Sequence, residues 1–136
     1  GAYLEVIYDG VWNAADYAHH LSRRARGLPL WFSLATHGTH AYADAVEQTL
    51  TVAQEAAKRI EQHPDLELVT DQQLSICVFR RKGWTLADYN RWSESQLEDG
   101  LSFVTPTKHN GETVLRFCIV NPRTTVEHIE EILASL

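Results

Sequence analysis

An apolar stripe at helical spacing is the clearest pattern in the chain, and it lies between His40 and Gln62. Apolar residues recur there at steps of three or four: Tyr42, Val46, Leu50, Ala53, Ala57 and Ile60. Polar and charged residues fill the positions between them. This period predicts one amphipathic helix, which the run His63-Pro64-Asp65 ends.

The preceding stretch predicts a shorter helix and a loop. Pro29 is tolerated in a first helical turn, and Gly38 is typical of a helix C-terminus, so a helix is expected from Pro29 to about His37. Residues Tyr3 to Asp16 show no sustained period and contain Asp9-Gly10, a turn-forming pair, so they are expected to form a loop.

The pattern after Asp65 changes to short segments typical of strands. Four strands are expected, at Leu66–Val69, Leu74–Arg80, Ser102–Thr107 and Thr113–Val120. Asn110-Gly111 predicts a tight hairpin between the last two, because both residue types tolerate positive φ.

Two further helices are predicted by capping boxes. Thr85 to Asp88 precedes a helix of about Leu86 to Asp99, and Thr124 to Glu127 opens a final helix that reaches Leu133. The order is therefore helix, two strands, helix, hairpin, helix. It predicts an α+β fold in which helices cover one face of a small antiparallel sheet.

Composition narrows the function classes. The chain has 136 residues and a formal net charge of −6, which argues against nucleic-acid binding. No apolar run is long enough for a membrane helix, and no signal peptide is visible. Cys77 and Cys118 lie in apolar runs and are expected to be two buried thiols in a reducing, cytoplasmic compartment. The start at Gly1 and the lack of methionine favour a fragment.

Few residues suggest catalysis by themselves. The seven histidines show no zinc-protease spacing, and the two cysteines form no C-x-x-C pair. A lysine that forms a Schiff base needs a desolvated pocket. Lys58, Lys82 and Lys108 all lie in polar or turn-forming contexts, so none is expected to serve that purpose.

Arg116 is the strongest candidate for binding chemistry. It lies in the middle of an apolar strand, where the strand period places Val114, Arg116 and Cys118 on one face. A charge buried there would need an anionic partner. That partner could be a structural carboxylate of the protein or the carboxylate of a ligand.

Several segments together resemble the group II pyridoxal-phosphate-dependent decarboxylases, which include aromatic-amino-acid, glutamate and diaminobutyrate decarboxylases. The matching segments are Arg23-Arg24-Ala25-Arg26-Gly27-Leu28-Pro29-Leu30-Trp31-Phe32, Asp65-Leu66-Glu67-Leu68-Val69, Cys77-Val78-Phe79-Arg80 and Leu115-Arg116-Phe117-Cys118-Ile119-Val120-Asn121-Pro122. They follow one another in the family's order and cover nearly the whole chain.

The resemblance implies the C-terminal portion of a type I pyridoxal-phosphate fold. Residues 1–27 would be the tail of the large cofactor domain with its mobile active-site loop, and residues 28–136 the C-terminal small domain. Tyr3 matches the loop tyrosine that acts as a general acid after CO₂ leaves, and Arg116 matches an arginine that contacts the substrate α-carboxylate.

The intact parent is then expected to be a homodimeric carboxy-lyase that converts an amino acid into an amine. The family's cofactor lysine precedes the loop tyrosine, so the fragment alone is expected to be inactive. Two alternatives stay open: a free-standing α+β module that binds a small acid or a partner protein, and a relative with a different pyridoxal-phosphate reaction. The sequence does not identify the substrate amino acid.

Overall fold

Helix α1 (Gly27–Gln62) joins both helices that the periodic patterns predict. The computed structural model describes residues 17, 19 and 24–136, so the predicted loop from Tyr3 to Asp16 lies outside the described residues. Gly38 has φ 77° and ψ 159°, a non-helical conformation that divides α1 into two helical segments. The expected end of a helix at Gly38 and the expected start of another near His40 are both confirmed.

The chain divides into two units, Gly1–Thr36 and His37–Leu136. In the described part of the first unit, the rings of Trp31 and Phe32 meet edge to face with centroids 5.1 Å apart. The second unit contains the remaining helical segment of α1 and every other described helix and strand. The expected domain division between residues 27 and 28 stays a prediction.

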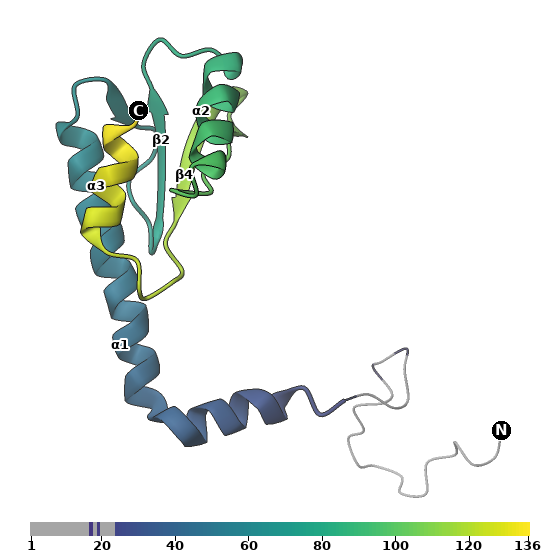
Figure 1. Cartoon of the computed structure of the whole chain (residues 1–136). Helices are drawn as coiled ribbons and strands as arrows, with labels where there is room; N and C mark the ends of the chain where they lie inside the picture. The colour runs from purple at the N-terminus through teal and green to yellow at the C-terminus, as the bar shows by residue number, and fades with distance from the viewer. Residues whose placement is uncertain (1–16, 18, 20–23) are drawn as a thin grey trace, which may run out of the picture. The chain divides into compact units, whose positions relative to one another are not determined.

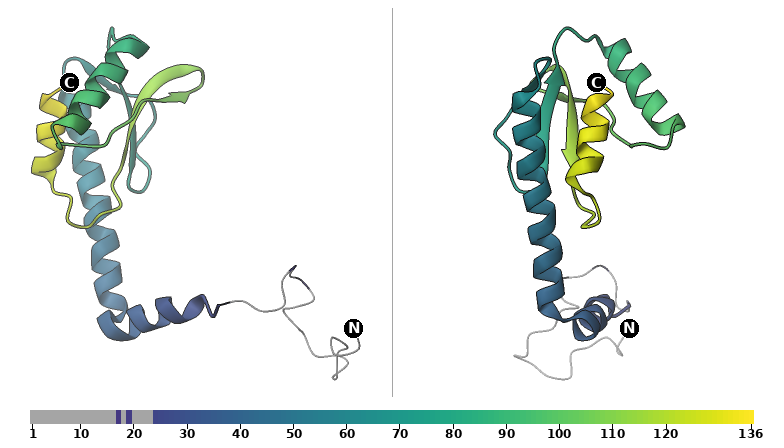
Figure 2. Two further views of the ribbon diagram at one scale, coloured as in Figure 1. Left: turned by 45° about the vertical axis from the view of Figure 1, so that its right-hand side comes forward. Right: turned by 60° about the vertical axis from the view of Figure 1, so that its left-hand side comes forward.

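The second unit is built on a four-stranded antiparallel sheet. Its strands are β1 (Leu66–Leu68), β2 (Ile76–Arg81), β3 (Thr107–His109) and β4 (Glu112–Cys118), in the spatial order β1-β2-β4-β3. Helices α2 (Leu86–Glu98) and α3 (Val126–Ala134) complete it. Figure 1 shows the strands with α1 and α3 side by side, as does the right-hand view of Figure 2. The predicted α+β fold and its element order are confirmed.

One hydrophobic core joins the sheet to all three helices. The largest fully buried side chains are Phe79, Ile60, Leu115, Val52, Val114 and Cys77. The core cluster also contains Tyr89 and Trp92 of α2 and Ile129 of α3. Cys77 and Phe79 of β2 and Leu115 and Phe117 of β4 belong to this cluster and share the face that packs against the helices, whereas Val114, on the other face of β4, is buried outside the cluster.

The apolar stripe on α1 is only partly buried. Ala53, Ala57 and Ile60 lie in the core, but Tyr42 and Val46, nearer the start of the helix, are exposed. The stripe therefore correctly predicts the helix and the side of it that faces the core. Only the C-terminal part of the stripe is buried in that core.

The turn and cap signals are mostly accurate. Asn110 and Gly111 have φ of 49° and 86°, as the tight hairpin requires. Thr85 forms the predicted capping box with Asp88. The box of α3 is displaced by one residue from the prediction: Thr125 has the extended N-cap conformation, and its partner is His128.

The strand predicted at Ser102–Thr107 is wrong in its bounds, since β3 covers Thr107–His109 and shares only Thr107 with it. Its pairing with β4 stops at Thr107 opposite Val114. None of the helices in the described part of the chain is both long and apolar enough to cross a membrane.

Candidate functional site

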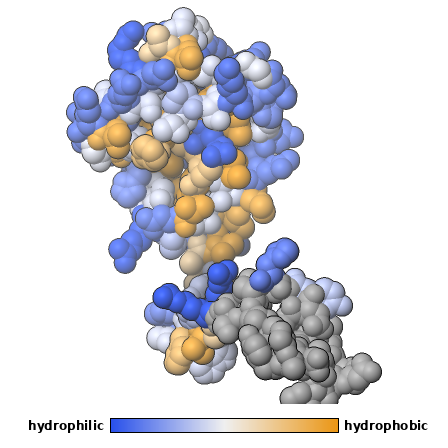
Figure 3. All heavy atoms as spheres, turned by 90° about the vertical axis from the view of Figure 1, so that its right-hand side faces the viewer, coloured by the Kyte–Doolittle hydropathy of each residue, from blue (hydrophilic) through white to orange (hydrophobic). Residues whose placement is uncertain are grey.

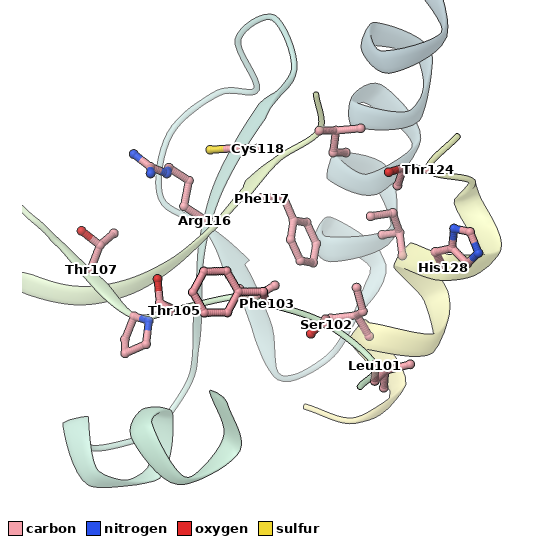
Figure 4. Close-up of a pocket in the computed structure, with 15 residues that line it drawn as sticks. Leu101, Ser102, Phe103, Thr105, Thr107, Arg116, Phe117, Cys118, Thr124 and His128 are labelled. Carbon is pink, nitrogen blue, oxygen red and sulfur yellow. The ribbon is translucent and has the colours of Figure 1, made fainter. Parts of the chain in front are cut away.

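Strand β4 presents Arg116 on the face of the sheet opposite the core. Arg116 is paired with Val78 of β2, while the flanking Leu115 and Phe117 are buried in the core. In Figure 4 the side chains of Arg116 and Cys118 point to the same side of β4, and Phe117 points to the other. This arrangement follows from the strand period and confirms the predicted grouping of Arg116 with Cys118.

The environment of Arg116 differs from the one expected. Its side chain is exposed, so the expected burial of the charge is wrong. No carboxylate of the described residues forms an ion pair with it, whereas Arg80, on the same face, is paired with Glu67 and Glu112. Arg116 is exposed because the helices cover the other face of β4. The guanidinium is therefore accessible to an anion from outside the described residues.

A pocket of about 650 Å³ lies beside this part of β4. It is lined by residues 101–107, by residues 116–119 and by Thr124, His128, Ile129 and Ile132 at α3. Figure 4 shows Thr105 and Phe103 across from Arg116 and Cys118, with His128 coming from α3. No aspartate or glutamate is among the lining residues, although the chain as a whole has a net charge of −6.

The pocket exists because residues 101–106 are held by α2 and do not pair with β4. The hydroxyl of Ser93 donates to the carbonyl of Val104 at 2.7 Å. The backbone amides of Leu101 and Ser102 donate to the carbonyl of Gln96 at 3.0 and 3.3 Å. Val104 is itself buried in the core. These contacts explain why the predicted strand from Ser102 is not formed before Thr107.

The two cysteines have opposite environments. Cys77 is completely buried, and its thiol lies 3.3 Å from the carbonyl of Ala53. Burial, with a smaller effect of the nearby Cys118, raises the pKa of the Cys77 thiol to about 11. Cys118 is exposed, so the expectation of two buried thiols is wrong for this residue. It shares its face of β4 with Arg116.

The described lysines do not fit the family's cofactor. Lys58 is exposed and forms an ion pair with Glu55 at 2.7 Å, while exposed Lys82 donates to the carbonyl of Pro64 at 2.8 Å. Lys108 is exposed on β3. None of the three is desolvated, as a Schiff-base lysine must be. The described residues also contain no cluster of His, Cys, Asp or Glu that could hold a metal ion.

Tyr3, the other candidate from the sequence, lies outside the described residues. The structure therefore places Arg116 but does not test its pairing with Tyr3. Sequence reasoning missed the pocket. A signal for it was present in Ser93 and Gln96, two polar residues of α2 whose side chains form hydrogen bonds with the carbonyl of Val104 and the hydroxyl of Ser102.

Comparison with known proteins identifies the family. The model of the pyridoxal-dependent decarboxylase conserved domain matches residues 2–82. An aromatic-L-amino-acid decarboxylase from Bacillus atrophaeus is 28% identical over 139 residues, which cover 97% of this chain and 29% of that protein.

Solved structures agree with this result. The glutamate decarboxylase domain of a diaminobutyrate-pyruvate transaminase and L-2,4-diaminobutyrate decarboxylase from Vibrio parahaemolyticus has a TM-score of 0.72 and 25% identity, covering 88% of this chain and 26% of that one. Oryza sativa TDC with PLP and tryptamine has a similar fold, with a TM-score of 0.77, 20% identity and coverage of 90% and 28%.

The chain spans less than a third of each of these proteins, at 29%, 26% and 28% of their lengths. The family model nevertheless matches more than half of this chain, and the fold agrees over most of the rest. The chain therefore belongs to the pyridoxal-dependent decarboxylase family.

Proposed function

We propose that this chain is the C-terminal portion of a pyridoxal-phosphate-dependent decarboxylase that releases CO₂ from an L-amino acid. Within it, residues 28–136 would be the small domain of a type I fold. The observation that carries the proposal is the exposed guanidinium of Arg116, which has no carboxylate partner among the described residues. The family resemblance implies the same role for Arg116.

Arg116 would hold the carboxylate of the amino acid through charge-assisted hydrogen bonds. A guanidinium suits this task because its planar fork can donate two parallel N–H bonds to one carboxylate. Its place on a strand also favours a fixed position, since β4 is paired with β2 on one side and its alternate residues are anchored in the core. Arg116 would thus orient the group that is lost as CO₂.

Tyr3 would supply the proton that replaces the carboxyl group, as the family resemblance implies. Pyridoxal phosphate supplies the electron sink of this reaction in the family. No described lysine fits its Schiff base, so we assign no step of that chemistry to this chain. The chain alone is accordingly expected to be inactive.

The test is the replacement of Arg116 in the full-length protein that contains this chain. Loss of hydrogen bonds to a charged group costs roughly 1.5–3 kcal/mol, so Arg116→Ala should raise KM about 10- to 100-fold. Arg116→Lys should recover only part of the loss, because an ammonium cannot reproduce the planar fork. Steady-state decarboxylation measured as CO₂ release provides both constants.

Arg123→Ala is the matched control, since Arg123 is also an exposed arginine of the second unit but lies outside β4. Unchanged KM and kcat for Arg116→Ala would exclude the proposed role. The homodimeric state and cytoplasmic location proposed for the parent are separate questions, which sedimentation and cell fractionation of the full-length protein address.

A non-catalytic α+β module is the second candidate. The exposed Arg116, which lines a pocket without acidic residues, would suit such a module as well. The module would bind a small acid or a partner protein without chemical change. Absence of CO₂ release from the full-length protein with aromatic, acidic and basic amino acids would favour it over the decarboxylase.

A further inference from the structure

The two capping boxes of the second unit have the same geometry but different chemistry. At α2 the amide of Thr85 donates to the carboxylate of Asp88 at 2.9 Å, and the amide of Asp88 donates to the Thr85 hydroxyl at 3.4 Å. At α3 the amide of Thr125 donates to Nδ1 of His128 at 3.2 Å, and the amide of His128 donates to the Thr125 hydroxyl at 3.4 Å. A glutamate or glutamine is the usual partner in such a box. The box of α3 is therefore closed by an imidazole in place of a carboxylate or amide.

The two acceptors respond differently to acid. Hydrogen bonds from the hydroxyl and the amide of Thr85 lower the pKa of the Asp88 carboxyl, so the box of α2 keeps its acceptor in mildly acidic solution. An imidazole accepts through Nδ1 only while its single proton is on Nε2. Histidine side chains generally gain a second proton between about pH 8 and 5, and both nitrogens are then donors. A protonated His128 could not accept the amide of Thr125, and its charge would lie at a helix N-terminus, where cations are disfavoured.

The first turn of α3 depends on contacts that are complete within the second unit. The amide of Ile129, a core residue, donates to the carbonyl of Thr125 at 3.4 Å. Thr124 and His128 line the pocket beside β4. The exposed apolar band on the face shown in Figure 3 differs from this turn, since no described residue covers it. A change in the box would therefore reach both the core contact of α3 and the wall of the pocket.

Charged side chains near His128 offer its protonated ring other partners. Glu131 lies one turn further along α3, at a spacing where helical side chains meet. Glu127 is the adjacent residue. A hydrogen bond with the Thr125 side chain lowers the pKa of its carboxyl, and smaller effects of His128 and of Arg59 on α1 lower it further. A carboxylate is thus available to accept an N–H of the imidazolium outside the box.

The elements packed against α3 bring no carboxylate to the pocket that His128 lines. Arg116 and Cys118 of β4 line the same pocket, and Arg116 lies on its other side in Figure 4. The pocket-lining residues between α2 and β4 carry no titratable side chain. Arg123 precedes the cap and is exposed, while Glu130 is held in an ion pair by α1. The hydrogen bond from the cap residue is therefore the contact that fixes the neutral ring.

We infer that the first turn of α3 is a pH-dependent conformational element, in which neutral His128 keeps the capping box closed and protonated His128 opens it. The neutral ring accepts the amide of Thr125 through Nδ1. The protonated ring releases that amide to water and turns its N–H groups toward Glu127 or Glu131. The wall of the pocket that α3 provides would accordingly loosen as the pH falls.

The experiment is an NMR titration of the isotope-labelled full chain between about pH 8 and 5. At the start of the titration the ring nitrogen shifts of His128 should identify the tautomer with its proton on Nε2. As the ring becomes protonated, the amide signal of Thr125 should move together with the ring signals. The hydrogen-exchange protection factor of the Ile129 amide should fall about 2- to 10-fold, as expected for loss of one neutral hydrogen bond. Protection factors are compared because they correct for the pH dependence of exchange itself.

Helix α2 provides an internal control. The amide of Tyr89 donates to the carbonyl of Thr85 at 3.1 Å, in the same position relative to its box as Ile129 in α3. Its protection factor should stay constant over the titration, because the acceptor of that box remains a carboxylate. A parallel fall at Tyr89 and Ile129 would indicate general acid destabilisation and would overturn the inference.

Substitutions at one exposed position separate the titration from the cap. His128→Gln supplies an amide oxygen that accepts at every pH, so the protection of Ile129 should stay high and the pH response should disappear. His128→Ala removes the acceptor, so protection should already be about 2- to 10-fold lower at neutral pH and should not fall further. Circular dichroism checks that both variants are folded.

His63→Gln is the matched control for the substitution. Nδ1 of His63 also accepts a backbone amide, that of Asp65 at 3.2 Å, but it lies after the C-terminus of α1. This variant should keep the full response of α3 to pH. Loss of the response in His63→Gln would assign it to the wrong histidine.

Three further results would overturn the inference: a ring proton on Nδ1 of His128 at neutral pH, a Thr125 signal that does not follow the ring, or an unchanged pH response in His128→Gln. The inference does not rest on the proposed decarboxylation, because the titration requires neither cofactor nor substrate. A failure of the decarboxylation would leave it intact.

Discussion

The two faces of the β2–β4 pair differ in most of their side chains and in how far those side chains are buried. One face carries Cys77, Phe79, Leu115 and Phe117, all buried against the helices. The other carries Ile76, Val78, Arg80, Val114, Arg116 and Cys118, of which Ile76, Arg116 and Cys118 are exposed and Val114 is buried. The same strands thus build the core on one side and present charge and a thiol on the other. Stability and binding chemistry can therefore be separated by substitutions only one residue apart.

The largest expected difference between the faces concerns packing. Phe79 is fully buried, and its ring centroid lies 4.7 Å from that of Phe117. Phe79→Ala should lower the free energy of unfolding by about 3–5 kcal/mol, because the lost contacts leave a cavity. Ile76→Ala, on the open face with 40% of its side chain exposed, should have a much smaller effect. Chemical denaturation of both variants measures the difference, and equal losses would show that the open face is also a core.

Local signals in the sequence predicted the local structure well. The Asn110-Gly111 turn and the Thr85 cap each depend on a few adjacent residues, and both have the expected geometry. The displaced cap at Thr125 shows the limit of such signals. Thr124 and Thr125 are both good N-cap residues, and a histidine at the third helical position, His128, replaces the expected glutamate as the partner of the cap.

Features that depend on distant contacts could not be predicted in this way. The sequence period placed Arg116 and Cys118 on one face, but it could not show which face the helices would cover. That choice decides whether a charge needs a buried partner. Similarly, residues 102–106 have the composition of a strand, yet their bonds to Ser93 and Gln96 of α2 hold them away from β4. The candidate pocket arises because these residues bond to α2 and therefore do not pair with β4.

The two cysteines provide a sharper comparison of the faces. The folded state keeps the buried Cys77 thiol protonated up to its pKa of about 11, whereas an unfolded thiol ionises near its ordinary value of 9.0. Between these pH values the unfolded state binds fewer protons, so stability falls as the pH rises. The loss should reach about 2 kcal/mol by pH 11.

Unfolding measured at several alkaline pH values should show this slope in the original chain and in Cys118→Ala, but not in Cys77→Ala. Comparison of slopes is required, because Cys77→Ala also loses packing at all pH values. An identical slope in all three proteins would show that Cys77 is not the group responsible.

The smallest expected effect concerns the ion pairs on the open face. Arg80 bridges Glu67 at 3.0 Å and Glu112 at 2.5 Å across three strands, and its hydrogen bond to Glu67 lowers the pKa of that carboxyl. A lowered folded-state pKa means that the stabilisation is present above the unfolded value and is lost as the pH falls through the folded one. Glu67→Gln should therefore cause a slight loss at neutral pH and a weaker decline under acid conditions than the original chain shows. The effect should shrink further in high salt, because both partners are accessible to solvent. A loss comparable with that of Phe79→Ala would mean that the open face contributes to folding as much as the covered one, and the separation of the two faces would not hold.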